Sequence, residues 1–132
     1  MSRWYFKRVF AAVASALMLA AGATVVTAGP AAAAGGGCIP WDRSGWSIQV
    51  CGSNQGRDAY LDFYVNGVNC SLCGLTIYKQ IEGNYRTRID NEPATYGHHG
   101  PWEHYLSGSQ RVRLIVEPND SGLSFAGPWV WY

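Results

Sequence analysis

The chain has 132 residues, and its ten Lys and Arg residues nearly balance its nine Asp and Glu residues. Residues 1–34 contain three of the basic residues and none of the acidic ones, so the remaining 98 residues carry a net charge of −2. Proteins that bind nucleic acid or an anionic membrane surface carry a basic excess, so this charge argues against both partners. A length of 98 residues fits one domain and excludes a second.

Residues 1–34 have the three parts of an export signal. Three basic residues start the segment, an apolar run covers residues 9–23, and three alanines stand before the cleavage site: Arg3, Lys7, Arg8, Ala32, Ala33 and Ala34. A membrane anchor is the alternative, but Ala and Gly dominate the run, where a spanning helix is rich in Leu, Ile and Val. We therefore expect cleavage before Gly35 and a secreted, extracellular domain over residues 35–132 with no membrane attachment.

Strand patterns fill the first half of this domain, and no segment of ten residues has helical periodicity. Residues 46–50 and 59–65 alternate apolar and polar side chains, and the Asn66-Gly67 pair that follows favours a hairpin turn. Leu75 and Ile77 mark a third strand. A turn over residues 82–84 leads to a fourth, over residues 85–89, with Arg86 and Arg88 on one face.

The second half begins with an irregular segment. Residues 91–102 contain two prolines and two glycines, a composition that predicts a loop. Strands are expected over residues 103–106, 111–116 and 129–132. Six or seven short strands in fewer than 100 residues predict an all-β fold, a small antiparallel β-sandwich of the immunoglobulin type.

Five segments carry a resemblance to known proteins: residues 47–51, residues 59–66, the strand opened by Cys73, residues 111–116 and the aromatic C-terminal residues. Together they resemble small secreted actinobacterial proteins of uncharacterised function. The resemblance covers most of residues 35–132. It implies export and the sandwich, and it implies no activity and no site.

Four cysteines in a small exported chain predict two disulfides. They are Cys38, Cys51, Cys70 and Cys73, and three pairings are possible. The resemblance implies that Cys51 pairs with Cys73, which leaves Cys38 to Cys70. The alternation agrees for Cys73, which has the inward parity of Leu75, but it gives Cys51 the parity opposite to Val50.

The densest group of chemically active side chains is His98, His99 and His104. Imidazoles close in sequence can bind a divalent metal or act as a general base, so a metal-dependent hydrolase centred here is one alternative function. The spacing of a zinc protease is absent, and a triad of Ser107 or Ser109 with His104 and Asp90 would lack a nucleophile elbow. We therefore expect a solvated loop, no catalytic residue and no cofactor.

Aromatic residues are the more unusual feature, with five Trp and seven Tyr in residues 35–132. Such rings stack on sugars or anchor protein interfaces. If the strands are neighbours, Tyr60 and Tyr64 would form an exposed aromatic and basic surface with Arg86 and Arg88. The candidate binding residues are Tyr60, Tyr64, Arg86, Trp129 and Trp131.

These observations predict a monomeric, non-catalytic protein that binds an extracellular protein or glycan. A small secreted enzyme inhibitor is a further alternative, because the expected architecture is similar to that of actinobacterial α-amylase inhibitors. The Trp-Arg-Tyr triplet of those inhibitors is absent, and Asn84-Tyr85-Arg86 is a poor substitute for it.

Overall fold

The computed structural model describes residues 35–132, so the predicted export signal lies outside the described residues. These residues form an all-β fold, as predicted. Among them no helix occurs that could cross a membrane. The strands are β1 (Gly37–Arg43), β2 (Trp46–Gln55), β3 (Asp58–Gly67), β4 (Gly74–Ile81), β5 (Thr87–Pro93), β6 (Gly97–Tyr105), β7 (Arg111–Pro118), β8 (Phe125–Ala126) and β9 (Val130–Trp131).

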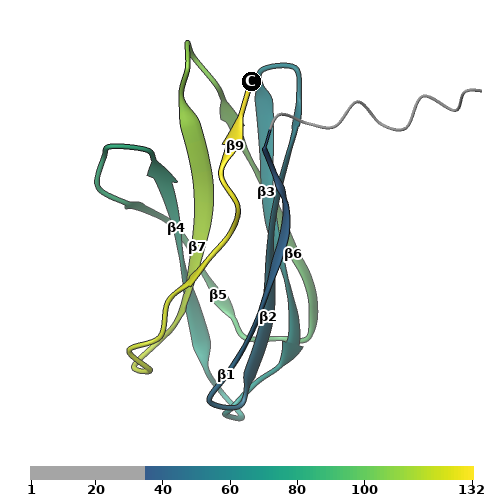
Figure 1. The fold of residues 1–132 in the computed structure, drawn as a ribbon. Coiled ribbons are helices and arrows are strands. Elements are labelled where there is room, and N and C mark those ends of the chain that lie inside the picture. The colour runs from purple at the N-terminus through teal and green to yellow at the C-terminus, as the bar shows by residue number, and fades with distance from the viewer. Residues whose placement is uncertain (1–34) are drawn as a thin grey trace, which may run out of the picture.

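The strands pair into two antiparallel sheets that lie as two layers (Figure 1). The first sheet has the order β1-β2-β3-β6, and the second has the order β5-β4-β7-β8, with β9 also paired to β7. The chain crosses from one sheet to the other after β3, after β5 and after β6. Strands that are neighbours in sequence therefore often belong to different sheets.

A single hydrophobic core receives side chains from both sheets. Leu61, Phe63 and Val65 of β3 are buried, as their alternation predicts, and Val112, Leu114 and Val116 of β7 are buried as well. Burying one such side chain contributes about 1.5–3 kcal/mol. The period-two pattern therefore correctly gives the inward face of the long strands.

Strand β6 runs through the segment that was predicted to be an irregular loop. The strand forms an edge of the first sheet and pairs only with β3, so Pro101 removes no hydrogen bond from an interior ladder. Gly100 has a φ of 101°, and a Cβ there would come within 2.9 Å of the Trp102 ring. Glycine and proline led to the prediction of a loop here, but an edge strand tolerates both.

The end of β3 also differs from the prediction. Gly67 still pairs with Ser47 of β2, so Asn66 and Gly67 belong to the strand and do not form a two-residue hairpin turn. The chain then crosses to β4 in the second sheet. An Asn-Gly pair permits a tight turn, but here the pairing with β2 continues through it.

Both lateral edges of the two layers are joined. At one edge, Gly35 forms a bridge with Val130, and the Trp41 Nε1–H donates to the carbonyl oxygen of Ala126 over 2.9 Å. At the other edge, His99 of β6 contacts Glu92 of β5. The first connection is mainly backbone, and the second depends on side chains.

The cysteines pair differently from the arrangement that the resemblance implied. Cys38 is bonded to Cys51, directly opposite it in the register of β1 and β2, with 4.1 Å between the Cα atoms. Cys70 is bonded to Cys73, three residues away in the connection from β3 to β4. The pairings of Cys51 with Cys73 and of Cys38 with Cys70 are therefore wrong. By the alternation of β2, the Cys51 side chain lies on the outward face, where it meets Cys38 of β1. Cys73 packs against the core, on the other side of the sheet.

Candidate functional site

The structure divides the five expected contact residues between two surfaces. Tyr60 and Tyr64 point outward from β3 in the first sheet. Arg86 lies in the turn between β4 and β5 of the second sheet, and Trp129 directly precedes β9, which contains Trp131. The expected surface of Tyr60 and Tyr64 with Arg86 and Arg88 is therefore wrong, because the chain changes sheets after Gly67.

Three arginines on the outer face of the second sheet each lie over an aromatic ring. The guanidinium carbon is 4.4 Å from the ring centre for Arg113 and Trp129, and 4.9 Å for Arg111 and Trp131. A third pair places that carbon of Arg86 at 4.2 Å from the ring of Tyr78. The arginine–aromatic face is defined by these residues: Tyr78, Arg86, Arg111, Arg113, Trp129 and Trp131.

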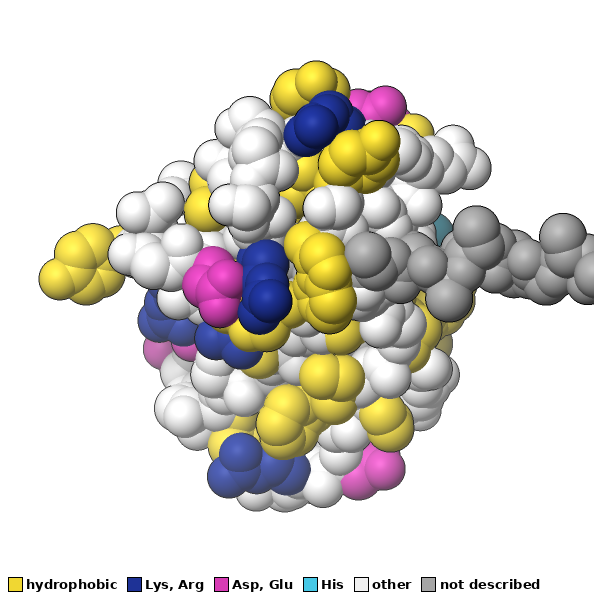
Figure 2. All heavy atoms as spheres, turned by 45° about the horizontal axis from the view of Figure 1, so that its top comes forward, with side chains coloured by type: hydrophobic (Ala, Val, Ile, Leu, Met, Phe, Trp, Pro, Cys, Tyr) yellow, Lys and Arg dark blue, Asp and Glu magenta, His cyan; other side chains and the backbone are white. Residues whose placement is uncertain are grey.

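The sequence of β7 explains why this face forms. Arg111 and Arg113 alternate with buried residues, so both must point away from the core. Strand β9 pairs with the start of β7 and places Trp131 opposite Arg111. Figure 2 shows basic side chains lying directly against hydrophobic ones at the end of the molecule that carries the C-terminus.

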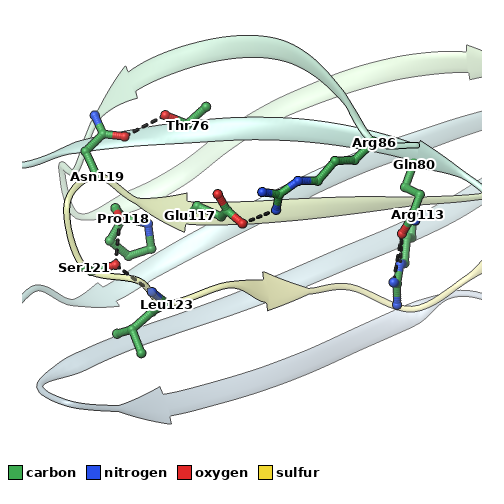
Figure 3. A network of polar contacts seen from close by, with 9 residues as sticks. All are labelled: Thr76, Gln80, Arg86, Arg113, Glu117, Pro118, Asn119, Ser121 and Leu123. Atoms are coloured by element: carbon green, nitrogen blue, oxygen red, sulfur yellow. Dashed lines mark hydrogen bonds and ion pairs between the residues drawn. The ribbon is translucent and has the colours of Figure 1, made fainter.

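Polar contacts hold the guanidinium groups in place (Figure 3). The Nε and one terminal nitrogen of Arg113 both donate to Gln80 Oε1, over 3.0 and 2.8 Å. Arg86 reaches across the sheet to an ion pair with Glu117. Burial lowers the pKa of Arg113, although a guanidinium remains protonated in proteins. The charges are thus fixed in position before any ligand arrives.

A polar groove of about 600 Å³ continues this face beyond Arg86. Its lining comes from β4, the end of β7 and the turn that follows: Thr76, Tyr78, Arg86, Glu117, Pro118, Asn119, Asp120, Gly122 and Leu123. The Thr76 hydroxyl donates to Asn119 Oδ1 over 2.6 Å, and the Ser121 hydroxyl donates to the Pro118 carbonyl over 2.6 Å. The groove therefore has a hydrogen-bonded wall that offers both donors and acceptors.

The three histidines proposed as metal ligands do not converge on one site. His98 lies on the outer face of the first sheet, with its Nε2 atom 2.8 Å from Asp62. His99 is buried, stacked on Phe63 with 4.7 Å between ring centres. Among residues 35–132, no group of three potential ligands is close enough to hold a metal ion. The structure thus separates the residues of the alternative metal site.

The possible triad receives no support, because its aspartate has another partner. Asp90 accepts a hydrogen bond from the indole nitrogen of Trp102 over 3.2 Å. The pKa of His104 is lowered by burial and by the nearby charge of Lys79, while a contact with Gln110 opposes this shift. His104 is therefore a partly buried side chain whose surroundings favour the neutral form, and Asp90 is engaged elsewhere.

The outer face of the first sheet has a different chemistry. Tyr64 lies against His98 with 4.8 Å between ring centres, and a shallow depression of about 390 Å³ lies beside Tyr60 and Asp62. Asp58 and Glu103 also point outward here, since each pairs with an outward tyrosine. The first sheet thus presents tyrosines with acidic side chains, where the second presents aromatic rings with arginines.

Sequence reasoning missed three residues of the arginine–aromatic face: Tyr78, Arg111 and Arg113. The signal was present, because Arg111 and Arg113 alternate with buried residues in a predicted strand. Pairing them with Trp129 and Trp131 required knowing that the last strand lies beside β7.

No family model, no curated protein and no solved structure matches this chain. The resemblance to small secreted actinobacterial proteins therefore stays a prediction, and the site is interpreted from its own chemistry.

Proposed function

We propose that this chain is a secreted, non-catalytic binding protein and that the arginine–aromatic face is its contact surface. One observation carries the proposal: three guanidinium groups lie over three aromatic rings on the outer face of one sheet. Arginine, tryptophan and tyrosine are the residues most enriched among the energetically dominant contacts of interfaces.

The geometry favours binding because the side chains are already ordered. Immobilising one flexible side chain at an interface costs about 0.5–1.5 kcal/mol, and a ring or an amide partner that fixes an arginine in advance reduces this cost. Arg86 and Arg111 nevertheless keep 41% and 46% of their side-chain surface exposed. Their remaining N–H groups are accessible to a ligand.

Export and architecture belong to the same proposal. The predicted signal and the two disulfides support an extracellular, monomeric protein. The shared core between two antiparallel sheets supports a β-sandwich. An immunoglobulin constant domain groups its first, second, fifth and fourth strands in one sheet. The order here is β1-β2-β3-β6, so the proposed likeness concerns the layered architecture and not the strand order.

An inhibitor function is the second candidate, and one observation favours it. Tyr85 is 98% exposed in the turn between β4 and β5, which projects from the body of the molecule (Figure 1). A rigid projecting loop can enter the active site of an enzyme. Loss of a partner with Tyr85→Ala but not with Arg111→Ala would favour the inhibitor.

The experiment is affinity capture from the culture fluid and cell wall of the producing cells, with protein starting at Gly35 as bait. We expect wild-type protein to retain a ligand that the R111A/R113A variant loses. The matched control is Y60A/Y64A, which alters the outer face of the first sheet. Equal capture by all three proteins, or loss only in the control, would contradict the proposed surface.

A further inference from the structure

We propose that the arginine–aromatic face binds an acidic polysaccharide whose charges are carboxylates. The arginines would take the carboxylates, and the adjoining groove would take the hydroxyl groups. This inference rests on the proposed function, because it names the ligand of the same surface.

The first step is the arrangement of the charges along one line. Arg111 and Arg113 stand two residues apart on β7, which corresponds to about 7 Å. Arg86 is bonded to Glu117, six residues beyond Arg111, or about 20 Å along the strand. Three separated cations in a row suit a chain with repeated negative charges better than they suit one small anion.

The second step is the kind of negative charge. Each guanidinium has an aromatic ring against one face, so a ligand reaches it through the N–H groups at its edge. Gln80 and Glu82 lie at the Nε side of Arg113 and Arg111, so the remaining N–H groups are the ones open to a ligand. A guanidinium edge matches a carboxylate with two parallel hydrogen bonds, which a lysine ammonium cannot do. The rings are half-buried beneath the arginines, so the exposed contacts of this surface are planar donors.

The third step is the groove beside Arg86. Thr76, Asn119, Asp120 and Glu117 line it with hydroxyl, amide and carboxylate groups, and a hydroxyl-rich ligand can satisfy this mixture of donors and acceptors. A peptide would find few apolar side chains there to receive its own. The groove therefore favours a glycan over an acidic protein.

The charges on the two outer faces also support an acidic ligand for the arginine–aromatic face. The outward residues of the second sheet and of the β4–β5 turn are four arginines and two glutamates, and Asp120 in the groove gives this side a net charge of +1: Arg86, Arg88, Arg111, Arg113, Glu82, Glu117 and Asp120. The outward positions of the first sheet carry Asp58, Asp62 and Glu103. A polyanion is therefore attracted to one face and repelled by the other, which fixes the side on which it binds.

The test measures retention on immobilised polygalacturonate, with cellulose as the neutral polymer. We expect wild-type protein to bind polygalacturonate and to bind less tightly as the salt concentration rises. Arg111→Ala should weaken the binding about tenfold, because a charge-assisted hydrogen bond contributes about as much as one decade of affinity. Arg43→Ala, the same charge change at the exposed end of β1, should leave the binding unchanged.

A conservative variant keeps the test valid if Arg111→Ala fails to fold. Arg111→Lys retains the charge but loses the planar edge, so it should also bind more weakly than wild type. Thermal melting of each variant separates lost binding from lost structure.

Several results would overturn the inference. Equal retention on cellulose would show that charge is not recognised, and stronger retention on dextran sulfate would show that carboxylates are not. Full competition by polyglutamate would assign the face to an acidic protein. An oligomer that Arg111→Ala dissociates would assign it to a second copy of the chain.

If polygalacturonate does not bind while cell-wall capture still depends on Arg111 and Arg113, the inference fails and the proposed function stands. If both are negative, both fail.

Discussion

The two sheets contribute equally to the core but present opposite chemistry to the solvent. On the second sheet, arginines cover half-buried aromatic rings. On the first sheet, Tyr64 lies against His98 among acidic side chains, and no arginine covers it. The comparison shows that aromatic content alone does not define a binding surface: the residues that cover each ring decide what a ligand would meet.

The largest expected effect is the difference in stability between removing a core ring and removing a ring of the outer face. Phe63 and Tyr64 are neighbours on β3, but Phe63 is fully buried and Tyr64 is 38% exposed. Phe63→Ala should lower the free energy of unfolding by about 3–5 kcal/mol, and Tyr64→Ala by less than about 1 kcal/mol. Chemical denaturation measures both. Similar losses in the two variants would mean that Tyr64 belongs to the core.

The adjacent histidines give the second comparison. His99 is buried and has an acceptor at each ring nitrogen, Glu92 at Nδ1 and the Thr95 carbonyl at Nε2. His99→Ala removes a ring stacked on Phe63 and leaves Glu92 without its partner, so it should cost about 3 kcal/mol. His98→Ala, on the outer face, should cost less than about 1 kcal/mol. An equal cost in denaturation experiments would refute the different placement of the two rings.

A smaller effect measures the coupling that distinguishes the second face. A double-mutant cycle on Arg113 and Trp129 should give an interaction of about 0.5–1 kcal/mol, the usual size for a cation over an aromatic ring. The control is a cycle on Arg113 and Tyr64, which lie on different faces and should be additive within about 0.5 kcal/mol. A coupling of zero in the first cycle would remove the energetic basis for calling the guanidinium groups ordered.

The smallest effect is a pH dependence. The pKa of His104 lies below its ordinary value of 6.5 because the ring is partly buried and near Lys79. The unfolded chain therefore binds a proton more readily than the folded one, and stability is lost as the pH falls through about 6.5. His104→Gln should reduce this loss between about pH 7.5 and 5.5. Thermal melting of the wild type and the variant against pH measures the difference, and an unchanged pH dependence in His104→Gln would contradict the prediction.

The alternation of residues was sufficient to predict the all-β fold and the inward face of β2, β3, β4 and β7. It could not predict which sheet a strand joins. Alternation shows on which face of its own strand a side chain lies, and it says nothing about which strand lies beside it. This is why Tyr60 and Arg86 were assigned to one surface. The pairing of Arg111 with Trp131 was hidden for the same reason.

Composition was misleading at β6. Glycine and proline disfavour an interior strand, but an edge strand accepts both, and an edge position is decided only when the sheet is assembled. The inward orientation of His99 depends on the register with β3, which shifts between Leu61 and Phe63. No local pattern of residues 91–102 contains that information.

Gly35 and Trp131 have a practical consequence for how this protein can be immobilised or labelled. Gly35 has a φ of 74°, and a Cβ at this position would overlap the ring of Trp131, so the start of the described chain lies directly against the arginine–aromatic face. The C-terminal Tyr132 follows Trp131 immediately and stacks with Arg57. An affinity tag or a solid support attached at either position would sit beside the proposed ligand and could block it. Coupling through the exposed turn at Ser44, at the end of the molecule opposite the C-terminus in Figure 1, keeps the support away from Arg111 and Trp131.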